Sequence, residues 1–297
     1  HGFKSKHSTT TALHNITNTI INGFNQKQPP SRTVLVSLDM SKAFDTVNIP
    51  KLTHKLLQTN TPTTVIKFTA NYLKGRQAFT TYNNSCSPKR NLKAGVPQGS
   101  VLSPSLFNLY TSDIPTPPPH TQLEAYADDL NPLASHQNIN IAQSHLQPYL
   151  NQIYQWTLDN NLTLNPDKSS ATLFTPDPAE YNTQLTLQIN NTTIPTNKHP
   201  KVLGLTLDPK LNFTKHIELS TTKASKSISV LKALTTTKWG KSKETITNTY
   251  KALTRPVLEY ASTTWSSIAS STSINKLQLS KTLPPHSLRL HSRYKDR

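Results

Sequence analysis

The acidic residues of this chain are few, and three of them lie where carboxylates could act together. The chain has 297 residues, with 15 Asp and Glu against 32 Lys and Arg. Asp39 ends a short β-branched apolar run, residues 34–38, that indicates a buried strand. Asp128 and Asp129 are adjacent, and they follow another short apolar strand at a point where a tight hairpin turn is expected. If the two strands are neighbours in one sheet, the three carboxylates converge.

Converging carboxylates indicate a metal-dependent reaction. Three such groups repel one another unless cations lie between them. Two Mg²⁺ ions about 3.5–4 Å apart satisfy that arrangement and suit in-line phosphoryl transfer. Mg²⁺ binds a few carboxylates together with phosphate oxygens of a substrate. The alternative is that Asp128 and Asp129 form an ordinary solvated turn, which is the more common role of an Asp-Asp pair on its own.

The positive charge is concentrated in the last third of the chain. The formal net charge is +17, with +4 in residues 1–197 and +13 in residues 198–297. This distribution indicates a polyanionic partner, and nucleic acid in particular, while a merely solvated basic face is an equally good interpretation of the charge alone. The single cysteine, Cys86, excludes a disulfide framework and a zinc cluster. No run of 18 apolar residues exists, so we expect no membrane span.

The apolar periodicity predicts alternating helices and short strands. Expected helices cover residues 8–24, a segment from about 50, 65–73, the end of 95–110, 141–162, and most of 214–265; expected strands cover residues 34–38, 80–86 as a hairpin, 123–126, 173–174, 185–189 and 202–207. Residues 266–297 are Ser-rich and basic with weak periodicity, which predicts a partly disordered tail.

Three motifs resemble those of reverse transcriptases. Residues 125–129, AYADD, resemble the polymerase motif that follows an apolar strand in these enzymes. Residues 38–47, LDMSKAFDTV, resemble their first metal-binding motif, and residues 95–104, GVPQGSVLSP, resemble their template and nucleotide motif. The order and spacing of the three motifs agree with the family.

Further blocks resemble the same family, and one of them resembles its non-LTR (LINE-like) retrotransposon branch. These blocks are residues 1–9, 156–168, 202–208 and 249–265, the last of which resembles the thumb of these enzymes. The resemblance therefore covers about residues 1–265. It implies an α+β fold of the right-hand polymerase type, with fingers, palm and thumb, an antiparallel palm sheet with helices on one face, and a helical thumb.

The resemblance also implies a domain plan and a reaction. Partial fingers would cover residues 1–30, the palm 31–200 with an inserted fingers segment at about 50–95, and the palm edge with a basic helical thumb 201–265, followed by the basic tail 266–297. The implied activity is RNA-directed DNA polymerisation within retrotransposon mobilisation. Its partners would be an RNA template, a DNA primer and deoxynucleoside triphosphates, with no membrane, in a nuclear or cytoplasmic ribonucleoprotein.

The implied catalytic residues are the three carboxylates and a lysine. Asp39 and Asp128 would hold two Mg²⁺ ions, for which Mn²⁺ could substitute, with Asp129 as a third carboxylate and the Met40 carbonyl as a further ligand. Lys168 matches a lysine for which the family implies protonation of the leaving pyrophosphate, and the alternative is that it is a solvated loop lysine.

The implied substrate-binding residues are four. Phe44 matches the steric gate that excludes the ribose 2′-hydroxyl, although a phenylalanine at this place could equally fill the core. Gln98 and Gly99 match residues that touch the nucleotide and the template, and Lys4 matches a basic residue that grips the triphosphate.

Some features depart from the family. Lys4 and His7 stand where Arg is usual, and Lys lacks the bidentate fork of Arg. Asn131 and Pro132 follow the Asp pair, and because Pro cannot donate to a sheet ladder we expect the hairpin to be shortened there. The start at His1 and the lack of endonuclease and RNase H signatures lead us to expect a fragment. Two alternatives remain: a catalytically inactive nucleic-acid-binding relic, and a reverse transcriptase of the group II intron or retron lineage.

Overall fold

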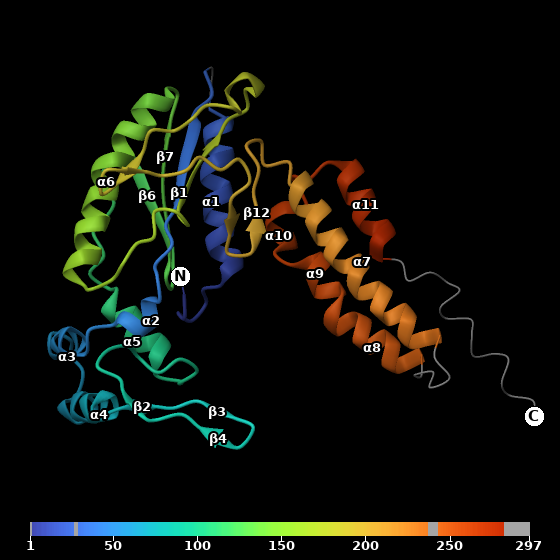
Figure 1. Ribbon diagram of the computed structural model, residues 1–297. Coiled ribbons are helices and arrows are strands. Elements are labelled where there is room, and N and C mark those ends of the chain that lie inside the picture. Colours follow the sequence, from blue (N-terminus) through green and yellow to red (C-terminus); the bar gives the residue numbers. More distant parts are fainter. Residues whose placement is uncertain (1, 27–28, 237–242, 282–297) are drawn as a thin grey trace, which may run out of the picture. The chain divides into compact units, whose positions relative to one another are not determined.

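The computed structural model describes residues 2–26, 29–236 and 243–281, which divide into two compact units (Figure 1). Unit 1 comprises residues 1–173 and 182–197, and unit 2 comprises residues 174–181 and 198–297. The two units do not coincide with the fingers, palm and thumb ranges expected from the sequence, which stay a prediction.

Unit 1 is built on a four-stranded sheet with the strand order β6-β7-β1-β8. The strands are β1 (Arg32–Ser37), β6 (Thr121–Tyr126), β7 (Asp129–His136) and β8 (Ser170–Phe174). Strand β7 pairs antiparallel with β1 and with β6. The expected α+β class with an antiparallel sheet is therefore confirmed.

Two long helices of unit 1 pack against this sheet, namely α1 (Thr9–Phe24) and α6 (Ile139–Asp159) (Figure 1). Val34 and Val36 belong to the same buried cluster as Leu146 and Leu150 of α6. Leu35, which points to the opposite face because side chains alternate along a strand, is fully buried as well. Helix α1 also contacts β1, β6 and β7, so both α1 and α6 shield the sheet from solvent.

A group of short helices and a hairpin of unit 1 lie at one end of the sheet (Figure 1). Helices α3 (Ile49–Leu57), α4 (Thr63–Leu73) and α5 (Ser103–Tyr110) confirm expected helical segments, whereas the short helix α2 (Ala43–Thr46) was not predicted from the sequence. Between α4 and α5 lies a hairpin made of β2 (Gln77–Ala78) with β5 (Arg90–Asn91) and β3 (Thr81–Tyr82) with β4 (Ser85–Cys86). Its strand residues are exposed, Cys86 included.

The expectation of a shortened hairpin at Asn131 and Pro132 is wrong. Strand β7 runs through both residues, which pair with Glu124 and Leu123 of β6. The interruption is instead in the pairing of β7 with its other neighbour, β1. That pairing covers Arg32 to Leu35 of β1 and continues only at the bridge between Leu38 and Leu130. Pro132 lies in this interval, and because it has no N–H, it interrupts one ladder without ending the strand.

The run at residues 202–207, expected as one strand, is a tight hairpin of β11 (Lys201–Val202) and β12 (Leu205–Thr206). Leu203 and Gly204 form its turn with φ values of +46° and +87°, as a two-residue turn of the primed type requires. The strand expected at residues 185–189 covers only β9 (Gln188–Ile189), which pairs with β10 (Thr192–Thr193).

Unit 2 is mainly helical. A short 3₁₀ turn (Pro178–Glu180) and the β11–β12 hairpin precede α7 (Thr214–Thr236), α8 (Lys243–Leu253), α9 (Arg255–Glu259), α10 (Ser262–Trp265) and α11 (Ser271–Lys281). Helix α7 contacts α8, α9 and α11. Within the tail that we expect to be partly disordered, residues 271–281 form a helix with Leu277 buried, and residues 282–297 lie outside the described residues. None of the helices in the described ranges is long and apolar enough to cross a membrane.

Candidate functional site

The two adjacent aspartates lie at the turn between β6 and β7. Tyr126 and Asp129 form the last cross-strand pair, so Ala127 and Asp128 make the turn. Ala127 has φ +54°, a conformation that costs a residue with a Cβ on the order of 1 kcal/mol. A Cβ added to Gly2 would lie 2.5 Å from the Ala127 nitrogen, so only glycine allows this close packing of the N-terminal segment on the turn.

Asp39 lies at the same edge of the sheet as this turn. The N–H of Leu38 donates to the carbonyl of Leu130 (2.8 Å), and the two residues form an antiparallel bridge. Asp39 and Asp129 are the next residues on the two segments. The prediction that the strand before Asp39 and the Asp-Asp hairpin are neighbours is therefore confirmed.

The Asp129 carboxylate experiences the negative charges of the other two aspartates. Asp129 is exposed as a residue, yet partial desolvation of its carboxyl group, followed by the negative charges of Asp128 and Asp39, raises the pKa of Asp129 to about 6. A divalent cation would relieve this repulsion, and carboxylate oxygens are the donors that Mg²⁺ prefers, so the donor chemistry fits such an ion. Within the described residues, however, no group of three or more His, Cys, Asp or Glu side chains is arranged to hold a metal ion. The predicted metal-ligand set stays a prediction.

The backbone of Asp39 and its neighbours is held by the segment after α6, at three residues that we call the Asp39 clamp: Thr163, Asn165 and Ser169. The Asp39 N–H donates to Ser169 Oγ (3.1 Å), and the Asn165 N–H donates to the Asp39 carbonyl (2.9 Å). The Ser41 N–H donates to the Thr163 carbonyl (2.9 Å).

Two predicted residues belong to this region. Met40 is buried and bridges to Leu164, within the segment that carries the clamp. Lys168 is exposed and directly precedes Ser169, so its backbone lies close to that of Asp39.

The glycine-rich motif at residues 95–104 docks on the segment after Asp39. The N–H groups of Gly95 and Val96 donate to the carbonyls of Val47 and Phe44, both at 2.8 Å. A Cβ at Gly95 would lie 2.7 Å from the Asp45 carbonyl oxygen, and the residue has φ +85°. Glycine is thus required here on two grounds, and the motif is held against α2.

A pocket of about 520 Å³ collects four of the predicted residues, Phe44, Gln98, Gly99 and Asp128. The full lining comprises Phe3, Lys42, Ala43, Phe44, Gln98, Gly99, Ser100, Val101, Ser103, Pro104 and Asp128. The pocket is thus lined by residues from all three sequence motifs. One of these residues, Asp128, is also a candidate metal ligand. Lys4 is exposed and is not among these lining residues, although its neighbour Phe3 is.

Aromatic contacts fix the ring of Phe44 in the pocket wall. It stacks on Phe107 of α5 with ring centroids 4.4 Å apart, and Phe3 meets it edge-on at 6.4 Å. Phe44 is only partly buried, so it both packs against the core and presents a face to the pocket. The two interpretations of Phe44 from the sequence are therefore compatible.

Gln98 and Gly99 lie at the exposed side of the pocket. Gln98 Nε2 donates to Asp45 Oδ1 (2.9 Å), which orients the side-chain amide. Gly99 has φ +82°, and no atom lies within 4 Å of the place of a Cβ. A ligand in the pocket can therefore approach the backbone at this point.

The sequence did not single out several residues of the site. Phe3 lines the pocket and touches Phe44, while Val101 is 92% exposed at its rim. Ser169 holds the Asp39 N–H. Val101 could have been predicted, because it is an apolar residue directly after the turn at Gly99 and Ser100. Phe3 contacts Phe44 about 40 positions away, and Ser169 binds the Asp39 N–H 130 positions away. No local sequence pattern predicts such long-range contacts.

Comparisons with known proteins agree with the motifs. The model of the family described as reverse transcriptase (RNA-dependent DNA polymerase) matches residues 1–207. A Drosophila melanogaster protein named probable RNA-directed DNA polymerase from transposon BS is 30% identical over 285 residues, 94% of this chain and 31% of its own length. The RNA-directed DNA polymerase from the Drosophila melanogaster mobile element jockey is 31% identical over 223 residues, 73% of this chain and 24% of its own.

The chain spans less than a third of the length of these curated relatives. Among solved structures, telomerase from Candida albicans in complex with a telomeric RNA fragment is similar with a TM-score of 0.46 and 13% identity, over 94% of this chain and 48% of that one.

Proposed function

The chain belongs to the reverse transcriptase family, and we propose that it adds deoxynucleotides to a DNA 3′ end on an RNA template. Its α+β fold is that of a right-hand polymerase, and its curated relatives come from non-LTR mobile elements. The observation that carries the proposal is the shared sheet edge of Asp39 and the Asp128–Asp129 turn, beside a pocket lined by Phe44, Gln98 and Gly99.

Reverse transcriptases generally use divalent metal ions, and we propose Mg²⁺ here, with Mn²⁺ as a substitute. Asp39 and Asp128 would hold the ions, with Asp129 as a third carboxylate and the Met40 carbonyl as a further ligand. Bound Mg²⁺ supplies positive charge that favours ionisation of the primer 3′-hydroxyl and stabilises the leaving pyrophosphate.

The chain's own residues orient the nucleotide in this proposal. The Phe44 ring, held by Phe107, excludes a ribose 2′-hydroxyl, while Gln98 and the backbone at Gly99 contact the nucleotide and template. Lys168, which directly precedes Ser169 of the Asp39 clamp, would donate a proton to the leaving pyrophosphate, and Lys4 would attract the triphosphate as a point charge.

The partners and the place of action follow from the same proposal. We propose an RNA template, a DNA primer and deoxynucleoside triphosphates as partners, and a nuclear or cytoplasmic ribonucleoprotein as the location. The basic residues of unit 2 would bind the backbone of an RNA–DNA hybrid, since A-form duplexes are recognised by shape and phosphate contacts. The second candidate, an inactive nucleic-acid-binding relic, has the basic charge in its favour but leaves the three aspartates unexplained.

Primer extension tests the proposal directly. On poly(rA)/oligo(dT) with Mg²⁺, the wild-type chain should incorporate dTTP, and Asp128→Ala should reduce the rate by a factor of about 1,000 or more because the variant loses a metal ligand. Asp177→Ala, which removes an exposed aspartate of unit 2, is the matched control and should extend like wild type.

RNA binding separates the two candidates. Asp128→Ala should bind the primer–template within about twofold of wild type, because the phosphate contacts come from basic residues. RNA binding by both proteins without extension by either would establish the relic and remove the enzyme.

A further inference from the structure

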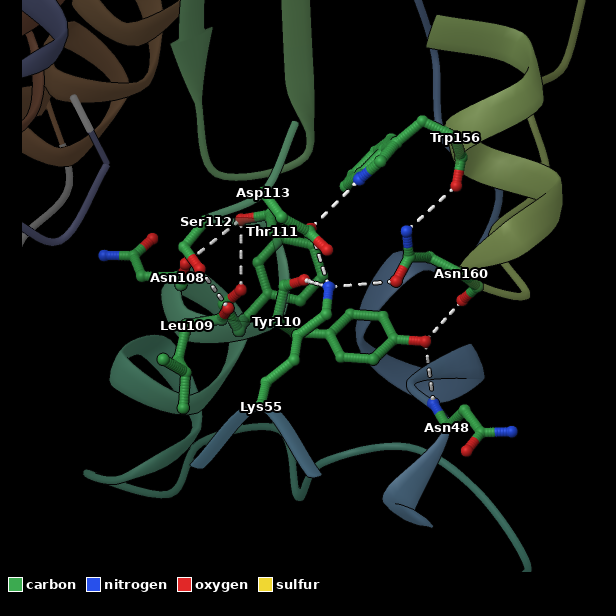
Figure 2. A network of polar contacts seen from close by, with 11 residues as sticks. Asn48, Lys55, Asn108, Leu109, Tyr110, Thr111, Ser112, Asp113, Trp156 and Asn160 are labelled. Carbon is green, nitrogen blue, oxygen red and sulfur yellow. Dashed lines mark hydrogen bonds and ion pairs between the residues drawn. The ribbon is translucent and has the colours of Figure 1, made fainter. Parts of the chain in front are cut away.

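Lys55, in the last turn of α3, has its ammonium group enclosed among three acceptors (Figure 2). Nζ donates to the Tyr110 carbonyl (2.5 Å), to Asp113 Oδ1 (2.7 Å) and to Asn160 Oδ1 (2.9 Å). An ammonium group has three donors, so all of them are used. The side chain is 12% exposed, which makes this a cation held inside unit 1.

The acceptors of Lys55 bring two further elements together. Tyr110 ends α5 and Asp113 follows it, while Asn160 is the C-cap of α6. The Tyr110 hydroxyl also donates to the Asn160 carbonyl, and Trp156 Nε1 donates to Asp113 Oδ1 (3.0 Å) (Figure 2). The network therefore joins α3, α5 and the end of α6.

The charge of Lys55 suits this place. Helix α6 has no basic residue in its last turn, so Lys55 supplies the cation that favours the negative end of the helix dipole. Burial alone would raise the pKa of Asp113, but the hydrogen bonds from Lys55 and Trp156 outweigh it and lower that pKa.

The end of α6 leads directly to the Asp39 clamp. Asn160 is itself buried, and its Nδ2 donates to the Trp156 carbonyl (3.0 Å), which closes the last turn. Thr163, the first clamp residue, follows three positions later, and the clamp holds both the N–H and the carbonyl of Asp39. A shift of Asn160 would therefore move the backbone that carries the Asp39 carboxylate.

We propose that Lys55 is a positioning residue for Asp39, acting through Asn160 and the Asp39 clamp. This inference rests on the proposed function, in which Asp39 binds the divalent ions. Loss of the ammonium group leaves the Asn160 Oδ1 and the Tyr110 carbonyl without this donor, which releases the end of α6. The effect then reaches the metal ions and leaves primer–template binding unchanged.

The test measures metal binding as well as activity. Mn²⁺ binding to the chain with primer–template is followed by electron paramagnetic resonance for Lys55→Met, with Lys51→Met as the control that removes a cation from the same helix. We expect Lys55→Met to weaken Mn²⁺ binding about fivefold and to raise the half-saturating Mg²⁺ concentration of extension by a similar factor. Lys51→Met and the affinity for primer–template should stay within about twofold of wild type.

Asn160→Ala provides a second route to the same answer. It should weaken Mn²⁺ binding similarly, and the double variant with Lys55→Met should be no weaker than either single variant, because both act through one path. If Lys55→Met does not fold, Asn160→Ala alone decides. Mn²⁺ binding equal to the control in a folded variant with a lowered melting temperature would make Lys55 purely structural and overturn the inference.

The outcomes separate this inference from the proposed function. A wild-type chain that extends primers while Lys55→Met matches Lys51→Met removes the inference alone. If the wild-type chain binds Mn²⁺ through Asp39 and Asp128 but extends no primer, the proposed function is overturned. The Mn²⁺ affinities of Lys55→Met and Lys51→Met then still decide whether Lys55 positions Asp39. Absence of Mn²⁺ binding at these aspartates overturns both.

Discussion

Phe44 shows how a single side chain serves both the core and the pocket. Its stacking on Phe107 restricts the ring, and the same residue lines the pocket together with Gln98 and Gly99. A restricted ring can discriminate by size, because it does not yield to an additional oxygen atom. The discrimination we propose therefore depends on the packing behind the ring as well as on the ring itself.

Replacing Phe44 tests this discrimination. Phe44→Val should lower the ratio of kcat/KM for dTTP over UTP by about tenfold or more, because the smaller side chain leaves room for the 2′-hydroxyl. Single-nucleotide incorporation on poly(rA)/oligo(dT) measures both values. Phe79→Val, which shortens an exposed phenylalanine outside the pocket, is the control and should leave the ratio unchanged. An unaltered ratio in Phe44→Val would assign Phe44 to the core alone.

Gly95 carries a second prediction at the residue scale. Gly95→Ala should lower the free energy of unfolding by about 2–4 kcal/mol, because the new Cβ meets the Asp45 backbone at a positive φ. Gly75→Ala is the matched control: it has φ +66° with no atom within 4 Å, and should cost about 1 kcal/mol. Urea denaturation measures both, and equal losses would contradict the proposed close contact.

At the scale of elements, the sequence predicted those parts whose signals are local. The turn at Asp128 and the strand before Asp39 could be predicted, because the apolar pattern of a strand and the residues of a tight turn are each contained in a short stretch of sequence. The continuity of β7 through Pro132 could not be predicted. Whether Pro132 interrupts the pairing with β1 or with β6 depends on the register of the three strands, which is not local information. Similarly, the apolar run predicts a strand through Gly204, whereas the positive φ at Leu203, which no residue type there indicates, makes a turn.

The packing between elements of unit 2 gives a prediction on pH. Burial lowers the pKa of His216 to about 4, and its ring lies among Thr206, Ser220 and Trp265. The neutral form is favoured in the folded state, whereas the unfolded state binds a proton near pH 6.5. Stability is therefore fully present above pH 6.5 and is lost as the pH falls towards 4.

The size of this loss can be isolated by substitution. Between pH 7.5 and 4.5 the wild type should lose about 2 kcal/mol more than His216→Asn, which cannot titrate in this range. Urea midpoints at several pH values measure the difference. Parallel pH profiles of the two proteins would show that His216 is not buried as described.

At the scale of the whole molecule, the charge distribution separates two roles. Residues 198–297 carry a net charge of +13, while the carboxylates at the pocket belong to unit 1. Composition alone could predict a polyanionic partner, but it could not assign particular lysines. Lys223 and Lys226 are exposed one turn apart on α7, which makes them candidates for phosphate contacts.

Salt dependence tests this assignment. The double variant Lys223→Gln and Lys226→Gln should weaken hybrid binding irrespective of sequence, and should reduce the slope of log K against log salt by about 1–2. Fluorescence anisotropy between 50 and about 300 mM salt measures the slope. Glu218→Gln, on the same helix, serves as the control for altered charge and should not reduce the slope. An unchanged slope in the double variant would place the contacts elsewhere.

The hairpin that carries Cys86 has a practical consequence. Because this thiol is exposed and is the chain's sole cysteine, a maleimide dye can be attached there without engineering other positions. Energy transfer from that dye to a second one on an added RNA strand would then measure, in single molecules, the distance from β3 and β4 to that strand.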